Sequence, residues 1–231
     1  METDFSYIDE NYKRITYNMQ EAAAKYRRAD EVINLMAVTK TVDPVAVNHA
    51  IGLGISLLGE NRVQEYTAKK DLYNKNAQVH FIGHLQTNKV KYIIDSVSVI
   101  QSVDSLKLAQ EIDRHAKRIS KTQDILIEVN IGGEESKSGT DKAALNELIY
   151  SVSELQNVRI KGLMAIPPIE SPEKFLYEMQ GLYIDISEKN IHNVSMEYLS
   201  MGMSGDYEDA IKYGSNIIRI GRGLFGPRNY F

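Results

Sequence analysis

The chain has 231 residues, with 27 Lys and Arg residues against 31 Asp and Glu residues, and it contains no cysteine. Its length allows one large domain or two small ones, and its net charge of −4 argues against a nucleic-acid partner, whose phosphates attract basic surfaces. The lack of cysteine excludes disulfides, thiolate nucleophiles, iron–sulfur clusters and cysteine-ligated zinc. The acidic, polar start is unlike a secretion signal, and no apolar run is long enough to cross a membrane. We therefore expect a cytoplasmic protein that makes no membrane contact.

An amphipathic helix is the first predicted element, over residues 7–30, because apolar residues such as Ile8, Ile15 and Met19 recur there at helical spacing. Short apolar runs then alternate with helical patterns, the clearest of which cover residues 105–119 and 142–155. Asp104 is expected to cap the first of these helices, and Thr140 or Asp141 the second. Eight strands are predicted, over residues 34–39, 56–59, 79–82, 98–102, 124–131, 159–165, 197–200 and 216–220.

Strands that alternate with helices are typical of βαβ units, and eight such strands close into a barrel. The sequence therefore predicts an α/β fold in which residues 1–231 form a single (β/α)8 TIM barrel with an extra N-terminal helix. We expect no helix after the eighth strand, and the N-terminal helix can cover the gap that this leaves.

Lys40 is the most informative polar residue, because it stands where the first strand ends. Active sites of such barrels lie at the C-terminal ends of the strands. Alternation along a strand places Met36, Val38 and Lys40 on one face. If that face lines the barrel, the amine sits at the mouth, where lost solvation favours the neutral form that attacks an aldehyde. The alternative is a solvated lysine at a strand end.

Two glycine-containing segments near the end of the sequence resemble anion-binding turns. Gly221, Gly223 and Gly226 match a dinucleotide fingerprint, but the helix, strand and acidic residue that such a site needs do not follow. A glycine-rich turn after the last strand can still bind phosphate through its N–H groups, and Ser204 with Gly205 forms a second such turn. The alternative is a pair of tight turns that close the barrel.

The charged residues around these turns argue both for and against an anion site. Asp206, Glu208 and Asp209 place negative charge near the second turn, and Arg219 and Arg222 can offset it.

Histidines and methionines carry no prediction of a metal or redox site. His80 and His84 stand about 13 Å apart if they lie on one strand, so they cannot share a metal ion. Met196, Met201 and Met203 are more typical of core packing.

Successive segments of the sequence resemble the pyridoxal phosphate homeostasis protein family, from about Leu35 to Tyr230. The matching segments are AVTKT at Lys40, GENRVQE at Asn61, HFIGHLQTNK, EVNIGGEESKSG at Lys137, GLMAIP, LSMGMSGD at Ser204 and RIGRGLFGPRNY. The resemblance implies a barrel similar to the N-terminal domain of alanine racemase, with pyridoxal 5′-phosphate (PLP) as the cofactor.

The resemblance also implies roles for individual residues. Lys40 would form the Schiff base with PLP, Asn61 would lie beside the cofactor, and Lys137 would be a second lysine that affects cofactor exchange. An arginine near the pyridine nitrogen would keep that nitrogen unprotonated, which weakens the cofactor as an electron sink. The residues expected to hold the phosphate and the ring edge are Met203, Ser204, Gly205, Arg219, Gly221, Arg222 and Gly223.

This sequence departs from the family at two positions. His84 stands where proline is common, and Arg222 stands where serine or threonine is common, so a guanidinium replaces a hydroxyl beside the phosphate.

Two functions that use PLP remain open at this stage, beside a third in which the barrel has lost its cofactor, Lys40 is inert and the protein acts by interaction alone. The first is a PLP-binding protein that maintains vitamin B6 homeostasis without catalytic turnover and hands PLP to apo-enzymes. The second is a PLP-dependent amino-acid racemase, which needs an acid/base group on each face of the bound substrate. In alanine racemase one of these groups is a tyrosine from a second domain, for which the eight strands leave no segment here. We favour the binding role and a monomer, since the racemase dimer is built by that second domain.

Overall fold

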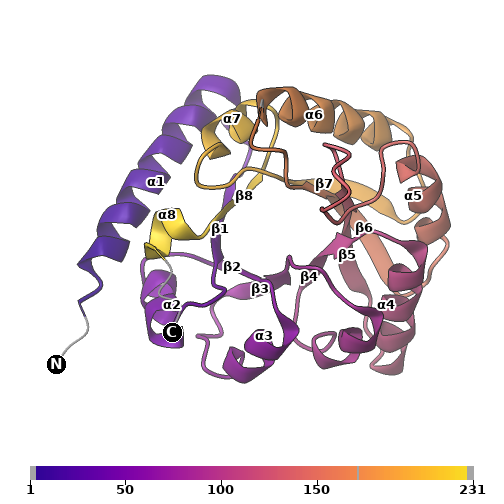
Figure 1. The fold of residues 1–231 in the computed structure, drawn as a ribbon, viewed down its shortest axis with the longest axis horizontal. Helices are drawn as coiled ribbons and strands as arrows, with labels where there is room; N and C mark the ends of the chain where they lie inside the picture. Colours follow the sequence, from indigo (N-terminus) through magenta and orange to yellow (C-terminus); the bar gives the residue numbers. More distant parts are fainter. Residues whose placement is uncertain (1–3, 171, 228–231) are drawn as a thin grey trace.

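Eight parallel strands form a closed barrel in the computed structural model, which describes residues 4–170 and 172–227 (Figure 1). Each predicted strand is present to within three residues at either end, so the predicted (β/α)8 barrel is confirmed. The strands are β1 (Asn34–Val38), β2 (Leu57–Glu60), β3 (Gln78–Phe81), β4 (Val99–Val103), β5 (Gln123–Val129), β6 (Val158–Ala165), β7 (Val194–Ser200) and β8 (Ile217–Ile220).

A ring of helices surrounds the strands, as the alternating pattern predicts (Figure 1). The barrel helices are α2 (Pro44–Gly52), α3 (Val63–Lys69), the 3-10 helix η1 (Thr87–Tyr92), α4 (Leu106–Arg118), α5 (Leu145–Ser153), α6 (Pro172–Glu188), α7 (Tyr207–Lys212) and α8 (Arg222–Phe225). No helix in the described part of the chain is both long enough and apolar enough to span a bilayer.

Both predicted helix caps are wrong. The side chain that caps α4 is Ser105, whose Oγ accepts a hydrogen bond from the N–H of Leu108 at 3.4 Å. The predicted cap of α5 fails because the main chain of Thr140 pairs beside the end of β5, where it forms a bridge with Val129 and its N–H donates to Glu128 O at 2.8 Å. A turn then intervenes, and α5 begins only at Leu145.

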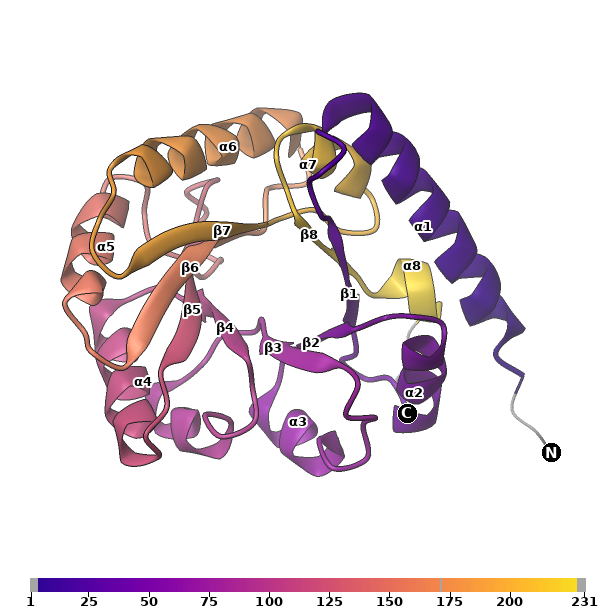
Figure 2. The ribbon, with the colours of Figure 1, turned by 180° about the vertical axis from the view of Figure 1, so that it is seen from behind.

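The N-terminal helix α1 (Ser6–Tyr26) covers the place where β8 meets β1, as expected (Figure 2). It packs against α2, α7 and α8 and buries Ile8, Ile15 and Ala22 against the barrel. A helix nevertheless follows the eighth strand, contrary to expectation: α8 is a single short turn, and α1 fixes it through a 3.0 Å hydrogen bond from Asn11 Nδ2 to Leu224 O.

Apolar side chains fill the barrel interior. Met36, Leu57, Ile82 and Ile217 form one cluster inside the ring of strands, which agrees with the alternation that places Met36 on the inner face. Most other buried apolar residues form the larger layer between the strands and the helices.

Gly162 marks the one place where β6 and β7 approach too closely for a side chain. Its φ of +147° lies in the region that favours glycine, and a Cβ atom there would be 1.8 Å from Tyr198 O. The β6–β7 register shifts at the same point. Glycine therefore allows the irregular pairing that brings Ser200 to the barrel mouth.

Replacing Gly162 with alanine should destabilise the barrel, because either β6 or β7 must move to accept the methyl group. We expect a loss of about 3 kcal/mol, or a fall of roughly 6–12 °C in thermal midpoint, measured by circular dichroism. Gly181→Ala is the matched control: Gly181 lies exposed in α6 with open space around it, so alanine should raise stability by about 1 kcal/mol. Equal midpoints for the two variants would contradict the role of Gly162.

Candidate functional site

A cavity of about 340 Å³ opens at the C-terminal ends of β1, β7 and β8, between them and the loop that follows β6. It brings together most of the residues that the sequence singles out. The residues that line it are Val38, Lys40, Pro167, Pro168, Ile169, Pro172, Met203, Ser204, Gly205, Asp206, Arg219, Gly221 and Arg222.

Lys40 stands half-buried in the turn directly after β1. Val38 and Lys40 both line the cavity, whereas Thr39 between them is fully buried on the other side of the strand. The lysine therefore continues the inner face of β1, as alternation predicts.

Arg219 is the most deeply buried charged group that reaches the cavity, with 4% of its surface exposed. Its Nη1 donates to Ser200 Oγ and its Nη2 donates to Ala165 O, each at 2.8 Å. Burial lowers the pKa of Arg219 to about 10, so the guanidinium keeps its charge at neutral pH. Two fixed acceptors hold it in one orientation.

A chain of hydrogen bonds continues from Arg219 through the barrel interior. The Ser200 hydroxyl donates to Gln101 Oε1 at 2.7 Å, and Gln101 Nε2 lies 2.8 Å from Nδ1 of His80. Burial lowers the pKa of His80 to about 3, so the imidazole is neutral and its Nδ1 accepts from the amide. The described residues include no group of three or more ligands able to hold a metal ion.

This chain of hydrogen bonds is the largest feature that the sequence did not reveal. The only signal for it is the phase of the strands: Gln101 and Ser200 occupy inner positions of β4 and β7, where apolar residues are usual.

Two turns face each other at the end of the cavity beside β8. The N–H of Gly223 donates to Ser204 Oγ at 3.2 Å, which joins the turn after β7 to the turn after β8. A Cβ atom on Gly223 would lie 3.0 Å from the same oxygen, so a side chain there would push the turns apart. Arg222 is exposed and lines the cavity next to these turns.

The acidic residues near the second turn are engaged elsewhere. Asp206 Oδ1 accepts from the Met203 N–H at 2.6 Å, within its own turn. Glu208 Oε1 accepts from Asn18 of α1 at 3.0 Å. Asp206 and Glu208 therefore keep their negative charge, and each has one carboxylate oxygen occupied by a local donor.

Some predicted site residues lie outside the cavity lining. Asn61 follows β2. Its main chain packs closely on Gly83: a Cβ atom added to Gly83 would lie 2.1 Å from Asn61 O. Lys137 pairs with Glu134 in the loop after β5. Gly132 of that loop packs against Pro168 on the cavity wall.

The remaining predicted residues give mixed outcomes. Met201 is fully buried, whereas Met203 is 36% exposed and lines the cavity, so its interpretation as core packing is wrong. His84 is exposed. Residues 228–230, which complete the last family-like segment, lie outside the described residues.

The donor set indicates the kind of ligand that fits. Lys40 supplies a primary amine, Arg219 and Arg222 supply guanidinium groups, and the two turns supply N–H and hydroxyl donors. An amine reacts with a carbonyl, and the guanidinium groups and turns bind phosphate. The residues present therefore fit a phosphorylated aldehyde such as PLP.

Glu128 is a second buried charge beside this site, on β5. It is 6% exposed, and its pKa is raised to about 7 by burial first and by Asp104 second, with Arg219 opposing both. The sequence analysis did not identify it, because its position within an apolar strand is its only signal.

Comparison with known proteins matches nearly the whole chain to one family. The family model for the N-terminal domain of alanine racemase matches residues 11–229. A protein of Aquifex aeolicus (strain VF5) named pyridoxal phosphate homeostasis protein is 41% identical over 226 residues, which cover 96% of this chain and 98% of the relative.

Solved structures agree with this placement. PipY of Synechococcus elongatus PCC7942, solved with PLP bound, is 29% identical and superposes with a TM-score of 0.77 over 92% of this chain and all of PipY (100%). Alanine racemase of Corynebacterium glutamicum shares the fold at 12% identity and a TM-score of 0.72, and the match covers 98% of this chain but 62% of the racemase.

Glu128→Gln should flatten the dependence of stability on pH. Because folding raises the carboxyl pKa from 4.5 to about 7, the folded state favours the protonated form, and the free energy of unfolding falls as pH rises through this window. The amide resembles the protonated acid, so above pH 7 the variant should exceed the wild type by at most about 3 kcal/mol. Urea unfolding between pH 4 and pH 8 measures this.

The control for this experiment is Glu147→Gln, an exposed carboxylate of α5. It should leave the pH profile unchanged. A Glu128→Gln profile parallel to that of the wild type would contradict the raised pKa.

Proposed function

The chain belongs to the pyridoxal phosphate homeostasis protein family, and we propose that it holds PLP as a Schiff base on Lys40 and maintains the intracellular supply of the cofactor. One observation carries this proposal: the Lys40 amine, two arginines and two donor-rich turns line a single cavity. When bound, PLP supplies an aldehyde that condenses with a lysine amine and releases water.

Each cavity residue has a definite part in this proposal. Ser204, Gly205 and Gly221 bind the phosphate through hydroxyl and N–H donors, and Arg222 adds positive charge beside them. Gly223 lies outside the cavity lining and supports the same turn, because its N–H holds Ser204 Oγ. Arg219 faces the ring edge as a charged donor, held by Ser200 and Ala165, and it cannot supply the negative charge that would keep a ring nitrogen protonated. Met203 packs against the ring, and Asn61 follows the adjoining strand β2.

A carrier role agrees better with this cavity than racemisation does. Among the described residues that line it there is no tyrosine, and its one carboxylate, Asp206, is bound by its own turn. Racemisation needs a second acid/base group opposite the lysine. We further propose that the protein acts as a cytoplasmic monomer in which residues 1–231 are one domain, that it donates PLP to apo-enzymes, and that Lys137 assists exchange.

Lys40→Ala tests the proposal directly. Purified wild-type protein mixed with PLP should show a visible Schiff-base absorption band, and borohydride should remove the band and attach the cofactor covalently. Lys40→Ala should lack both signals, whereas Lys137→Ala, the matched control, should keep both. A band of equal size in Lys40→Ala would assign the cofactor to another lysine and overturn the proposal.

Turnover separates the carrier from the racemase. Loaded protein is incubated with L-alanine, and the products are resolved by chiral chromatography. At most about one equivalent of D-alanine per subunit is expected for a carrier. Many turnovers per subunit would contradict the carrier function and support the racemase.

Arg222→Ser should weaken PLP binding about threefold at low salt, because an exposed charge beside a phosphate contributes modestly and is screened. The difference from the wild type should shrink above about 0.5 M NaCl. Arg118→Ser, which removes an exposed arginine at the end of α4, is the matched control and should bind PLP as the wild type does. Absorbance titration of the Schiff-base band gives all three affinities, and equal values for Arg222→Ser and Arg118→Ser would exclude a phosphate contact.

A further inference from the structure

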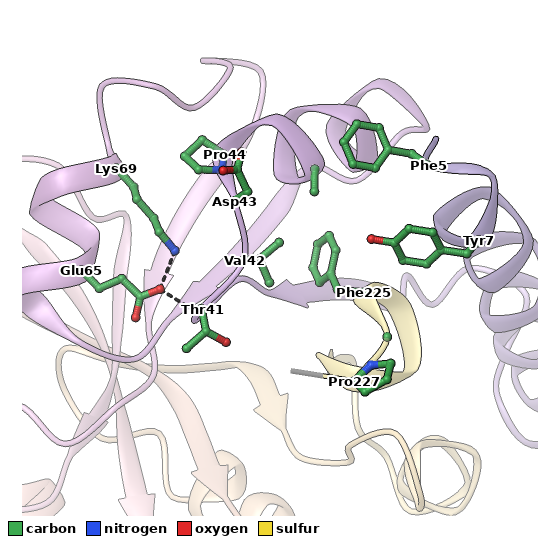
Figure 3. Close-up of a pocket in the computed structure, with 12 residues that line it drawn as sticks. Phe5, Tyr7, Thr41, Val42, Asp43, Pro44, Glu65, Lys69, Phe225 and Pro227 are labelled. Atoms are coloured by element: carbon green, nitrogen blue, oxygen red, sulfur yellow. Dashed lines mark hydrogen bonds and ion pairs between the residues drawn. The ribbon is translucent and has the colours of Figure 1, made fainter. Parts of the chain in front are cut away.

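Helix α3 contacts the main chain on both sides of Lys40 (Figure 3). Glu65 Oε1 accepts hydrogen bonds from the Thr41 N–H and from Lys69 Nζ. Lys69 Nζ also lies 3.4 Å from Thr39 O, to which it donates. The Glu65–Lys69 pair therefore bonds the residue before the lysine and the residue after it.

This pair is unlike an ordinary surface ion pair. Its side chains are largely buried, with 18% of Glu65 and 16% of Lys69 exposed. A carboxylate that accepts a main-chain N–H in such surroundings makes a charge-assisted hydrogen bond, which is stronger than a neutral one. We call Glu65 and Lys69 the α3 clamp.

Thr41 needs such support because its backbone is in a disfavoured conformation. Its φ of +62° lies in the left-handed region, which β-branched residues rarely adopt. The Thr41 hydroxyl donates to Lys40 O at 2.6 Å, and the Val42 N–H closes the turn on Thr39 O at 3.1 Å. Without the hydrogen bond to Glu65, the left-handed conformation of Thr41 loses stability relative to an extended one, and the backbone is expected to relax toward the latter.

Relaxation at Thr41 would change where Lys40 points. Lys40 lines the cofactor cavity, whereas Thr41 and Val42 line a second cavity of about 560 Å³ on the other side of the turn, beside Phe225 (Figure 3). Successive residues of this turn thus line different cavities, Lys40 the first and Thr41 and Val42 the second.

We propose that the α3 clamp is a positioning device for the Schiff-base lysine: it holds the turn after β1 left-handed so that the Lys40 amine meets the aldehyde of PLP. This inference rests on the proposed function and adds Glu65 and Lys69 to the residues that PLP loading requires. Within the described residues, the hydrogen bonds and the ion pair of Glu65 go to Thr41 and Lys69, and none goes to Arg219 or to the two phosphate turns.

Glu65→Gln tests the clamp, because the amide keeps the shape of the side chain but loses the charge. The affinity for PLP, read from the Schiff-base band, should fall about tenfold, as expected when a charge-assisted hydrogen bond is weakened. Pyridoxine 5′-phosphate, which lacks the aldehyde, should bind within about twofold of the wild type, because its binding does not need the lysine. The affinity of pyridoxine 5′-phosphate for Lys40→Ala, measured by fluorescence titration in competition with PLP, gives the value expected for binding without the lysine.

Glu31→Gln is the matched control. Arg27 and Glu31 form a partly buried i, i+4 pair, and Arg27 also donates to the main-chain Ser215 O at 3.1 Å, but this pair lies at the start of β8, away from the barrel mouth. Loss of the Glu31 charge should lower the thermal midpoint about as much as loss of the Glu65 charge, without changing the affinity for PLP.

Thr41→Gly in the Glu65→Gln background provides a rescue. Glycine adopts positive φ without a side-chain clash, so the turn should form without the clamp, and PLP affinity should return to within about threefold of the wild type. Lys69→Gln is a second variant that weakens the other half of the clamp, and it should lower PLP affinity in the same direction.

The outcomes separate this inference from the proposed function. Wild-type affinity for PLP in Glu65→Gln and Lys69→Gln, or equal losses for PLP and pyridoxine 5′-phosphate, would overturn the clamp and leave the carrier intact. A wild-type protein that forms no Lys40-dependent band would overturn both. Failure of Thr41→Gly to rescue a folded Glu65→Gln would exclude the left-handed turn as the cause.

Discussion

Closure of the sheet between β8 and β1 is the constraint on which the site depends. The two strands pair from Asn34↔Ile217 to Ala37↔Ile220, which places Met36 beside Arg219 and leaves Lys40 at the mouth. Lys40 and Arg219 belong to the first and the last strand of the sequence, so only the pairing of these two strands brings them into one cavity. Helix α1 covers this junction from outside and supports the short helix that follows β8.

The neighbouring junction, between β7 and β8, has the short pairing of a closed barrel, and the cavity lies at its C-terminal end. Ser200↔Ile217 is the one register pair between these two strands, and side chains add further bonds across the junction. The Ser215 hydroxyl lies within hydrogen-bonding distance of Leu199 O and Met201 O, and Asn216 Oδ1 accepts from the Leu199 N–H. Beyond this point one more main-chain bond continues the contact: the Arg219 N–H donates to Gly202 O at 3.0 Å, in the turn that carries Ser204.

The polar interior explains how a charged arginine is tolerated inside the barrel. A buried charge without partners costs several kcal/mol, so each group needs a defined acceptor or donor. Because Arg219 can only donate, the Ser200 hydroxyl donates onward to Gln101 Oε1, and the Gln101 amide then donates to Nδ1 of neutral His80, so every bond in the chain has one direction. A guanidinium whose partners cannot reverse their roles has little freedom to turn, and it presents a constant charge to the cavity.

The sequence predicts the strands and helices, whose apolar residues recur at regular spacing, and the polar residues that end the strands. It does not predict contacts between segments that are distant in the sequence. Apolar periodicity located all eight strands and the covering helix, a strand end identified Lys40, and the family resemblance identified Arg219. The cap of α4 was misplaced by one residue, because Asp104 and Ser105 are equally suitable by type. Gln101 and Glu65 were missed since their importance comes from partners across the barrel or along another element, which no local pattern encodes.

Thr41 illustrates why such a residue carries information once its backbone is seen. Of the non-glycine residues with positive φ in the described part of the chain, Thr41 is the β-branched one, whereas Asn190 and Asn193 are of a type that tolerates this region. A conformation of this kind costs on the order of 1–3 kcal/mol, and it persists only where the surroundings enforce it. Here the enforcing groups belong to α3, and the residue they constrain follows the one amine that lines the cavity. The strain is therefore best understood as the cost of aiming Lys40.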